Sequence, residues 1–222
     1  MKLFRKSFNN SLTISFLLLT IPPLFSAYHR PENENAVSAS LTSSIPVANE
    51  KYVIDKKESS VTWKCSMSFA KKGGHNGYIS LSKGELTVDN GQLTSGTVEV
   101  DMNTIADEKH ASDNDLIEHL KSPDFFDVEK FPISKFAIVK VVLAEGGNIN
   151  VTGIMTIKGI MQTITIPAKV EVKGGVVTVN GKLTIDRTKW DITYKSGAFF
   201  ADLADEAISD KIELEMKIVA KK

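Results

Sequence analysis

The residues from Val61 to Phe69 alternate strictly between apolar and polar side chains. A period of two places one face of a strand on a core and leaves the other in water, which is typical of a half-buried β-strand. No helical apolar pattern alternates with these runs, which argues against a parallel α/β sheet. The chain is therefore predicted to be mainly β, that is, an all-β fold. The same alternation returns at residues 98–102, 164–172, 177–185 and 212–218.

Turn-forming sequences such as Asn90-Gly91 separate the alternating runs. One short helix is expected between the third and fourth strands. Eight antiparallel strands joined by tight hairpins favour an up-and-down barrel, because closure leaves no exposed strand edge. A two-sheet sandwich is the alternative on the pattern alone. The eight predicted strands are residues 59–69, 78–89, 92–103, 133–144, 148–158, 162–172, 176–186 and 207–219.

A short amphipathic helix is predicted to end just before Pro123, because proline disfavours helical geometry in the residue before it. Two adjacent aromatic residues, Phe125 and Phe126, follow in a loop. Leaving them in water forfeits roughly 1.5–3 kcal/mol each, so both are expected to be buried. They either plug one end of a hydrophobic core or also form part of the wall of an apolar ligand pocket.

The segment 119–127, His-Leu-Lys-Ser-Pro-Asp-Phe-Phe-Asp, resembles the signature of the YceI-like proteins, a bacterial group of lipocalin-like, polyisoprenoid-binding envelope proteins. The resemblance covers about residues 52–219. It implies an eight-stranded antiparallel lipocalin-like barrel rather than a sandwich, with a long isoprenoid tail held in an interior tunnel. Further segments resemble other motifs of the family, in the same order along the chain. They are residues 61–63 with 75–77, 98–102 with Asp107, 153–159, 186–190 and 208–212.

The N-terminal part of the chain differs in composition from the rest. Three basic residues precede an apolar run of about ten residues, 12–21, which is shorter than the roughly 20 residues of a membrane-spanning helix. Residues 1–27 are therefore predicted to be an export signal or an N-terminal anchor. Residues 28–50, rich in polar residues and proline, are predicted to be a flexible tether. The barrel occupies residues 51–222, and we expect a periplasmic or cell-envelope location, with secretion also open.

The charges of the chain balance, with 27 lysines and arginines against 27 aspartates and glutamates. This balance gives no long-range field that would attract nucleic acid, and the sequence carries no phosphate-binding glycine loop. Nucleic acid is therefore not an expected partner. The single cysteine, Cys65, excludes an intrachain disulfide, and its place in an alternating run predicts a small buried apolar side chain.

The sequence offers few side chains that could bind a metal or act in catalysis. The histidines lack the two-ligand spacing of a metal site, so neither a metal nor another cofactor is expected. Ser122, His119 and Asp124 could be drawn together as a catalytic group, and Cys65 could be paired with a histidine in the same way. No nucleophile elbow or glycine-rich oxyanion loop accompanies them, so the chain is predicted not to be an enzyme.

Two polar residues are assigned to the barrel ends. His75 precedes a turn dipeptide, and its family-like position implies a structural role or a contact with a ligand head group at the cavity mouth. Arg187 is expected to form a structural ion pair with one of three nearby aspartates, Asp210 among them. It lies beside Trp190, which is expected to close the floor of the cavity.

Strand length bounds the size of the interior. Strands of about eleven residues, at about 3.3 Å per residue and a tilt near 40°, give a barrel roughly 28 Å tall. Slim apolar side chains at the inward positions then predict a long narrow cavity, with the polar end of a ligand near a mouth. The residues expected to line it are Trp63, Met67, Phe69, Val98, Val100, Met102, Ile164, Ile166, Leu214 and Met216, with the loop residues Phe125, Phe126, Phe199 and Phe200.

A flexible apolar chain suits such a cavity, because its binding needs buried area and few polar contacts. The resemblance implies a carrier or store of a polyisoprenoid lipid, such as an isoprenoid quinone or its precursor, in the cell envelope. Transient membrane contact and a homodimer are left open. The competing hypotheses are a closed barrel that acts as an envelope interaction or stress-related module without lipid cargo, and a lipid-modifying enzyme.

Overall fold

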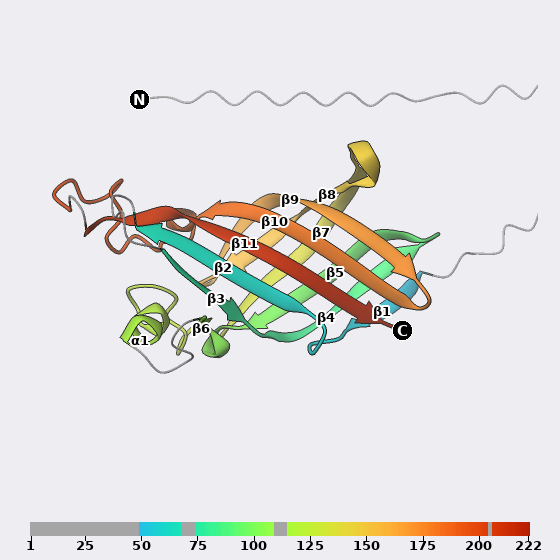
Figure 1. Cartoon of the computed structure of the whole chain (residues 1–222), viewed down its shortest axis with the longest axis horizontal. Helices are drawn as coiled ribbons and strands as arrows, with labels where there is room; N and C mark the ends of the chain where they lie inside the picture. Colours follow the sequence, from blue (N-terminus) through green and yellow to red (C-terminus); the bar gives the residue numbers. More distant parts are fainter. Residues whose placement is uncertain (1–48, 68–73, 109–114, 204–205) are drawn as a thin grey trace, which may run out of the picture. The chain divides into compact units, whose positions relative to one another are not determined.

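Antiparallel strands form one sheet in the computed structural model, which describes residues 49–67, 74–108, 115–203 and 206–222 (Figure 1). The described strands are β1 (Glu50–Ile54), β2 (Ser60–Met67), β3 (His75–Ile79), β4 (Leu81–Asp89), β5 (Gln92–Asp101), β6 (Ala106–Asp107), β7 (Ile133–Leu143), β8 (Ile149–Ile157), β9 (Ile160–Lys173), β10 (Val176–Asp186) and β11 (Ile208–Lys221). The helices are α1 (Asp115–Lys121) and the 3-10 helices η1 (Met102–Thr104), η2 (Glu145–Gly147) and η3 (Arg187–Trp190). Within these ranges no helix combines the length and apolarity needed to span a membrane.

The eleven strand segments close into a barrel of eight strand positions. β1 and β2 share one position because both pair with β11: Val53 lies opposite Lys221, and Cys65 lies opposite Ile212. β3 and β4 share the next position, because only Ser80 separates them. β5 and β6 share the third position, because β5 pairs with β4 and β6 pairs with β3. β7, β8, β9, β10 and β11 complete the ring in that order. The predicted eight-stranded antiparallel barrel, with one short helix between its third and fourth strands, is confirmed.

The first strand position is interrupted by a turn that the sequence pattern did not predict. Asp55 Oδ1 accepts hydrogen bonds from the backbone N–H groups of Lys57, at 2.9 Å, and Glu58, at 3.2 Å. Before this turn, β1 buries the side chains of Tyr52 and Ile54. Val53 between them is apolar although 67% exposed, so β1 does not alternate in sequence, and the predicted strand at 59–69 accounts for only the second half of this position.

The inner face of the barrel follows the predicted alternation. Leu183, Leu214 and Trp63 lie opposite one another on β10, β11 and β2. Gly77 of β3 is next in the same row. A Cβ atom at Gly77 would lie 2.8 Å from Cζ2 of Trp63, closer than van der Waals contact allows. It would also clash with the carbonyl oxygen of Ala106, so the missing side chain at Gly77 makes room for both β6 and the indole ring.

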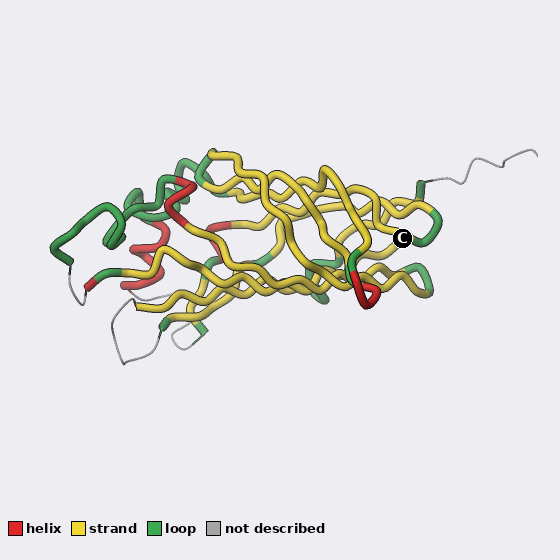
Figure 2. Tube along the Cα trace, turned by 90° about the horizontal axis from the view of Figure 1, so that it is seen from above, coloured by secondary structure: helices red, strands yellow, loops and turns green. Residues whose placement is uncertain are grey.

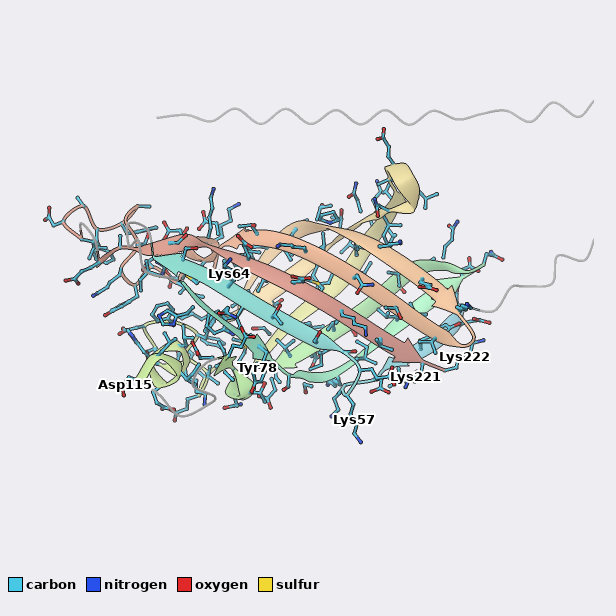
Figure 3. All side chains as sticks on the ribbon, viewed as in Figure 1. Lys57, Lys64, Tyr78, Asp115, Lys221 and Lys222 are labelled. Carbon is cyan, nitrogen blue, oxygen red and sulfur yellow. The ribbon has the colours of Figure 1, made fainter. Side chains whose placement is uncertain are left out.

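Two groups of buried side chains fill the barrel. One group, which includes Tyr52 and Val177, lies toward the end that carries the C-terminus. The other, which includes Ile117 of α1 and Trp190, lies toward the opposite end. Figure 2 shows that the helix and most of the irregular loops gather at this second end, which we call the helix-bearing end. The labelled side chain of Asp115 lies there, whereas those of Lys221 and Lys222 lie at the other end (Figure 3).

The loop after α1 folds back onto the helix. The backbone N–H of Phe126 donates to the carbonyl of Leu120, at 3.1 Å, and that of Val128 donates to the carbonyl of Lys121, at 2.9 Å. This turn places Phe125 in the interior, with 6% of its surface exposed, and leaves Phe126 half-buried. The loop therefore covers the helix-bearing end of the barrel with an aromatic side chain.

Candidate ligand-binding site

An apolar cavity of about 160 Å³ lies inside the barrel, mainly among the side chains of its helix-bearing half. Its wall joins inward-facing strand residues to residues of the loop after α1 and of η3. The structure brings these predicted ligand-binding residues together at the wall: Trp63, Val98, Val100, Met102, Phe125, Phe126, Ile166, Trp190, Leu214 and Met216.

Other predicted residues do not reach the cavity. Ile164 shares a face of β9 with Ile166 but packs into the neighbouring core. The His75 side chain is 47% exposed, and its Nδ1 lies 3.4 Å from Asp107 Oδ2, so it contacts a buried carboxylate instead of the cavity. Phe69 and the side chain of Met67 lie outside the described residues.

Phe199 and Phe200 depart from the prediction that they form part of the pocket wall. They lie on the surface, 59% and 50% exposed. The reason is a local turn: the backbone N–H groups of both residues donate to the carbonyl of Ser196, at 3.1 and 3.0 Å. Ser196 is itself fully buried, and its hydroxyl donates to Asp210 Oδ2 at 2.9 Å. This anchored turn holds the two aromatic rings outside, while Phe125 takes the interior place.

Several wall residues were not selected from the sequence. Phe136 lies opposite Val98 on one side and Met155 on the other, so all three share the inner face. The signal that could have found Phe136 and Met155 is this register, which aligns them with Val98. Single-strand alternation gives the face of each residue but not its neighbours across the sheet. Further wall residues that were not selected from the sequence include Ile79, Ile105, Ile157, Ile185, Ile192 and Ile212.

Arg187 is the buried charge beside the cavity, with a side chain only 1% exposed. Its Nη2 lies 3.1 Å from Asp210 Oδ1, which is the ion pair expected from the sequence. Its guanidinium also donates to the carbonyls of Ser209, Ile192 and Ile208, at 3.0, 2.8 and 3.1 Å. Burial lowers the pKa of Arg187, and the neighbouring Asp210 carboxylate opposes that shift. These contacts of Arg187 are structural and hold η3 against β11.

Cys65 also lines the cavity. Burial raises the pKa of its thiol, an effect that the positive charge of Arg187 opposes. The Sγ atom lies 3.8 Å from the carbonyl of Ser209, a weak hydrogen bond at most. A raised pKa leaves less thiolate at neutral pH, so Cys65 is a poor nucleophile here.

Two polar groups of the wall have no hydrogen-bond partner within the described part of the chain. They are the indole N–H of Trp63 and the hydroxyl of Ser134, both in buried residues. The other wall tryptophan differs, because Nε1 of Trp190 donates to the carbonyl of Met155 at 3.3 Å. Both atoms are almost inaccessible, so the surface of the cavity itself is apolar.

The groups considered for catalysis are engaged in structural contacts. The Ser122 hydroxyl donates to the carbonyl of His119, at 2.8 Å, where α1 ends. His119 Nε2 lies 3.3 Å from Asp124 Oδ2, and its ring packs edge-on against Phe125 with centroids 5.1 Å apart. The hydroxyl is thus bonded to backbone, not to the imidazole. Among the described residues, no three metal-binding side chains come together.

A closed antiparallel barrel with an apolar cavity defines a class of proteins that enclose apolar groups. The family model of the YceI-like domain matches residues 52–220. The chain therefore belongs to the YceI-like family.

Relatives of this chain include proteins of Shewanella and Vibrio species. The chain is 30% identical over 132 residues to a UPF0312 protein of Shewanella denitrificans, an alignment that covers 60% of this chain and 68% of that protein. It is 31% identical over 123 residues to a UPF0312 protein of Vibrio parahaemolyticus, covering 53% of this chain and 61% of the relative. The matches therefore span about two thirds of the length of these relatives.

Solved structures share the fold. The chain is similar to BcnA of Burkholderia cenocepacia, with a TM-score of 0.61 and 23% identity, covering 76% of this chain and 99% of that one. It is also similar to a polyisoprenoid binding domain from Saccharophagus degradans, with a TM-score of 0.55 and 10% identity, covering 77% and 97%. At these identities the comparison shows a common fold.

Proposed function

We propose that the protein binds a long-chain polyisoprenoid lipid in the barrel interior, for transport, storage or sequestration in the cell envelope. The observation that carries the proposal is the cavity, whose wall is almost wholly apolar. The likeness to a polyisoprenoid binding domain supports the class of ligand. Moving an apolar chain out of water is favourable by about 0.8 kcal/mol per CH₂ group, less the cost of ordering the chain.

The size of the cavity sets a condition on this binding. Its volume of about 160 Å³ compares with roughly 300–1,000 Å³ for typical ligand pockets. A cavity of about 150 Å³ takes a group of the size of benzene, so this one takes the end of a prenyl chain as it stands. A longer chain requires the wall to move. Met102, Met155 and Met216 line the wall, and unbranched methionine side chains readily change shape.

The same volume favours a second candidate function. A barrel filled by its own side chains would act as an envelope interaction or stress-related module without lipid cargo. The two candidates differ in whether the cavity widens when prenyl lipid is offered. In neither candidate does the protein act as an enzyme, and in both the chain is exported by its N-terminal residues 1–27.

A cavity-filling variant tests the proposal. Val100 lines the cavity, so Val100→Trp is expected to abolish binding of a fluorescent prenyl probe. Met161→Trp is the matched control, because Met161 is 68% exposed on β9 and is expected to leave binding intact. Circular dichroism checks both folds, because overpacking destabilises a core by typically 1–3 kcal/mol. Full probe binding by a folded Val100→Trp protein would contradict the proposal.

A further inference from the structure

An uncharged run of exposed residues lies in the segment between η3 and β11. Residues 197–201, Gly-Ala-Phe-Phe-Ala, are all exposed, with Phe199 at 59% and Phe200 at 50%. Figure 1 shows this segment, in dark orange, beyond the ends of β2 and β11 at the helix-bearing end. Single exposed apolar residues are common on soluble proteins, but an adjacent group of them is typical of an interaction site.

The turn that exposes the two rings is fixed to the barrel. The backbone N–H groups of both phenylalanines donate to the carbonyl of Ser196, and the Ser196 hydroxyl donates to Asp210 Oδ2 at 2.9 Å. The N–H of Ile208, the first residue of β11, donates to the carbonyl of Lys195 at 2.8 Å. The fold therefore holds the two rings outward.

Asp210 also joins this turn to the wall of the cavity. Its Oδ1 lies 3.1 Å from Nη2 of Arg187, which lines the cavity and lies over the ring of Phe125, another wall residue. The opposite end of the barrel is filled by the buried group that includes Tyr52 and Val177, which are 1% and 0% exposed. The exposed rings therefore lie at the end of the barrel that is nearer the cavity.

The size and charge of this patch indicate what covers it. Complete burial of both rings would hide about 200 Å², well below the roughly 800 Å² that each partner contributes to a stable protein interface. A second copy of the chain, or another protein, would therefore need contacts beyond the patch. Lys195, the nearest lysine in the sequence, is paired with Glu206 at 2.6 Å, so its charge is already balanced. A bilayer requires no matching surface, because a few apolar side chains in its interface give weak, reversible binding.

We propose that residues 197–201 dock the protein reversibly on a zwitterionic lipid bilayer, with the rings of Phe199 and Phe200 in its interfacial region. Docking brings the helix-bearing end of the barrel to the membrane. A prenyl lipid is too apolar to cross water freely, so it passes between bilayer and cavity at this end. This inference rests on the proposed function and deepens it by naming the source of the cargo. Docking raises the rate of lipid exchange and leaves the equilibrium affinity for the lipid unchanged.

A tryptophan reporter tests the contact locally. Phe199→Trp, in the full chain, is mixed with phosphatidylcholine vesicles whose brominated acyl chains quench tryptophan fluorescence on contact. Leu143→Trp is the matched control, because Leu143 is 70% exposed at the opposite end of β7 from the loop after α1. Trp63 and Trp190 are buried in both proteins. Residues 1–27 are also the same in both, so a difference between them reports the position of the reporter.

We expect the vesicles to quench the Phe199→Trp reporter and to leave the Leu143→Trp reporter unquenched. Quenching of Phe199→Trp alone would support the inference. Equal quenching of the two reporters, or no quenching of Phe199→Trp, would overturn it.

The rate of lipid transfer tests the consequence of docking. The double variant Phe199→Ala/Phe200→Ala should take up a fluorescent prenyl probe from phosphatidylcholine vesicles at least about tenfold more slowly than the wild type. Its equilibrium affinity for probe added from solution should stay within about twofold, because exposed positions affect the fold little. Val142→Ala/Leu143→Ala removes an exposed apolar pair at the far end of β7 and should transfer the probe at the wild-type rate.

The two proposals fail in different ways. A wild-type transfer rate in Phe199→Ala/Phe200→Ala would overturn the inference and leave the proposed function standing. Failure of the wild type to bind the probe from either source would refute the proposed function, and the reporter measurement would then decide the docking by itself.

Discussion

Nη2 of Arg187 lies 3.1 Å from Oδ1 of Asp210, and this ion pair joins η3 to β11 at the helix-bearing end of the barrel. Arg187 is 1% exposed and Asp210 is 25% exposed. The guanidinium carbon also lies 5.8 Å from the ring centroid of Phe125. The pair therefore holds three parts of the site together: the loop after α1, η3 and the start of β11.

Replacing Asp210 with asparagine should lower the free energy of unfolding by about 3 kcal/mol, because Arg187 would stay buried without its counter-charge. Urea denaturation measures the change. The matched control is Lys182→Ala, because Lys182 Nζ lies 3.6 Å from Glu213 Oε2 in an exposed pair. Exposed pairs contribute little, so this variant should show no measurable change. Equal stabilities of the two variants would contradict a structural role for the Arg187–Asp210 pair.

The ion pair between Asp55 and Lys221 predicts a pH-dependent contribution to stability. Their side chains are 2.7 Å apart, and this hydrogen bond, with those from the N–H groups of Lys57 and Glu58, lowers the pKa of Asp55 below its ordinary value of 3.8. A carboxyl group with a lowered folded-state pKa stabilises the fold above its unfolded pKa, and the gain is lost as the pH falls through the folded value. The stability of Asp55→Asn should therefore be lower than that of the wild type at pH 7. The difference should shrink below pH 3.8.

Thermal unfolding of both proteins between neutral and acid pH checks this expectation. A difference that stays constant, or grows, on acidification would show that the Asp55 carboxylate adds no stability through its charge. High salt should reduce the difference at neutral pH, because the Lys221 side chain is 42% exposed and its charge is screened.

The raised pKa of the Cys65 thiol predicts slow alkylation at neutral pH, because the thiolate is the reactive form. Iodoacetamide labelling followed by intact-mass measurement should show a slower rate for the folded protein than for the urea-unfolded chain. The rate should rise further with pH than for an ordinary thiol. Because Cys65 lines the cavity, bound prenyl lipid should slow the labelling of the folded protein further. Labelling of the folded protein at the unfolded rate would contradict the burial of this thiol.

Much of the barrel could be predicted from the sequence, because an antiparallel strand with one dry face must alternate. The residues opposite one another in the structure, such as Leu183 and Leu214, are the inward positions of that alternation. The break at Asp55 was missed, because it depends on hydrogen bonds that the Asp55 side chain accepts from N–H groups of its own turn.

The site was predicted only in part. Alternation shows which side chains point into the barrel, but not which of them border the cavity. Ile164 and Ile166 share an inner face, yet only Ile166 lines the cavity. Which inward position borders empty space depends on how neighbours fill the interior, as Trp63 does above Gly77. For the same reason the surface positions of Phe199 and Phe200 could not be predicted from their apolar character. They follow from the turn at Ser196.

The most direct test of the account is to purify the full chain after expression in a bacterial envelope and identify organic-extractable molecules by mass spectrometry. The account predicts a polyprenyl species in stoichiometric amount. Intact-mass measurement of the same sample tests the proposed export by locating the N-terminus. A protein that carries no prenyl lipid, and takes none up when soaked with it, would contradict the account and favour a closed barrel without cargo.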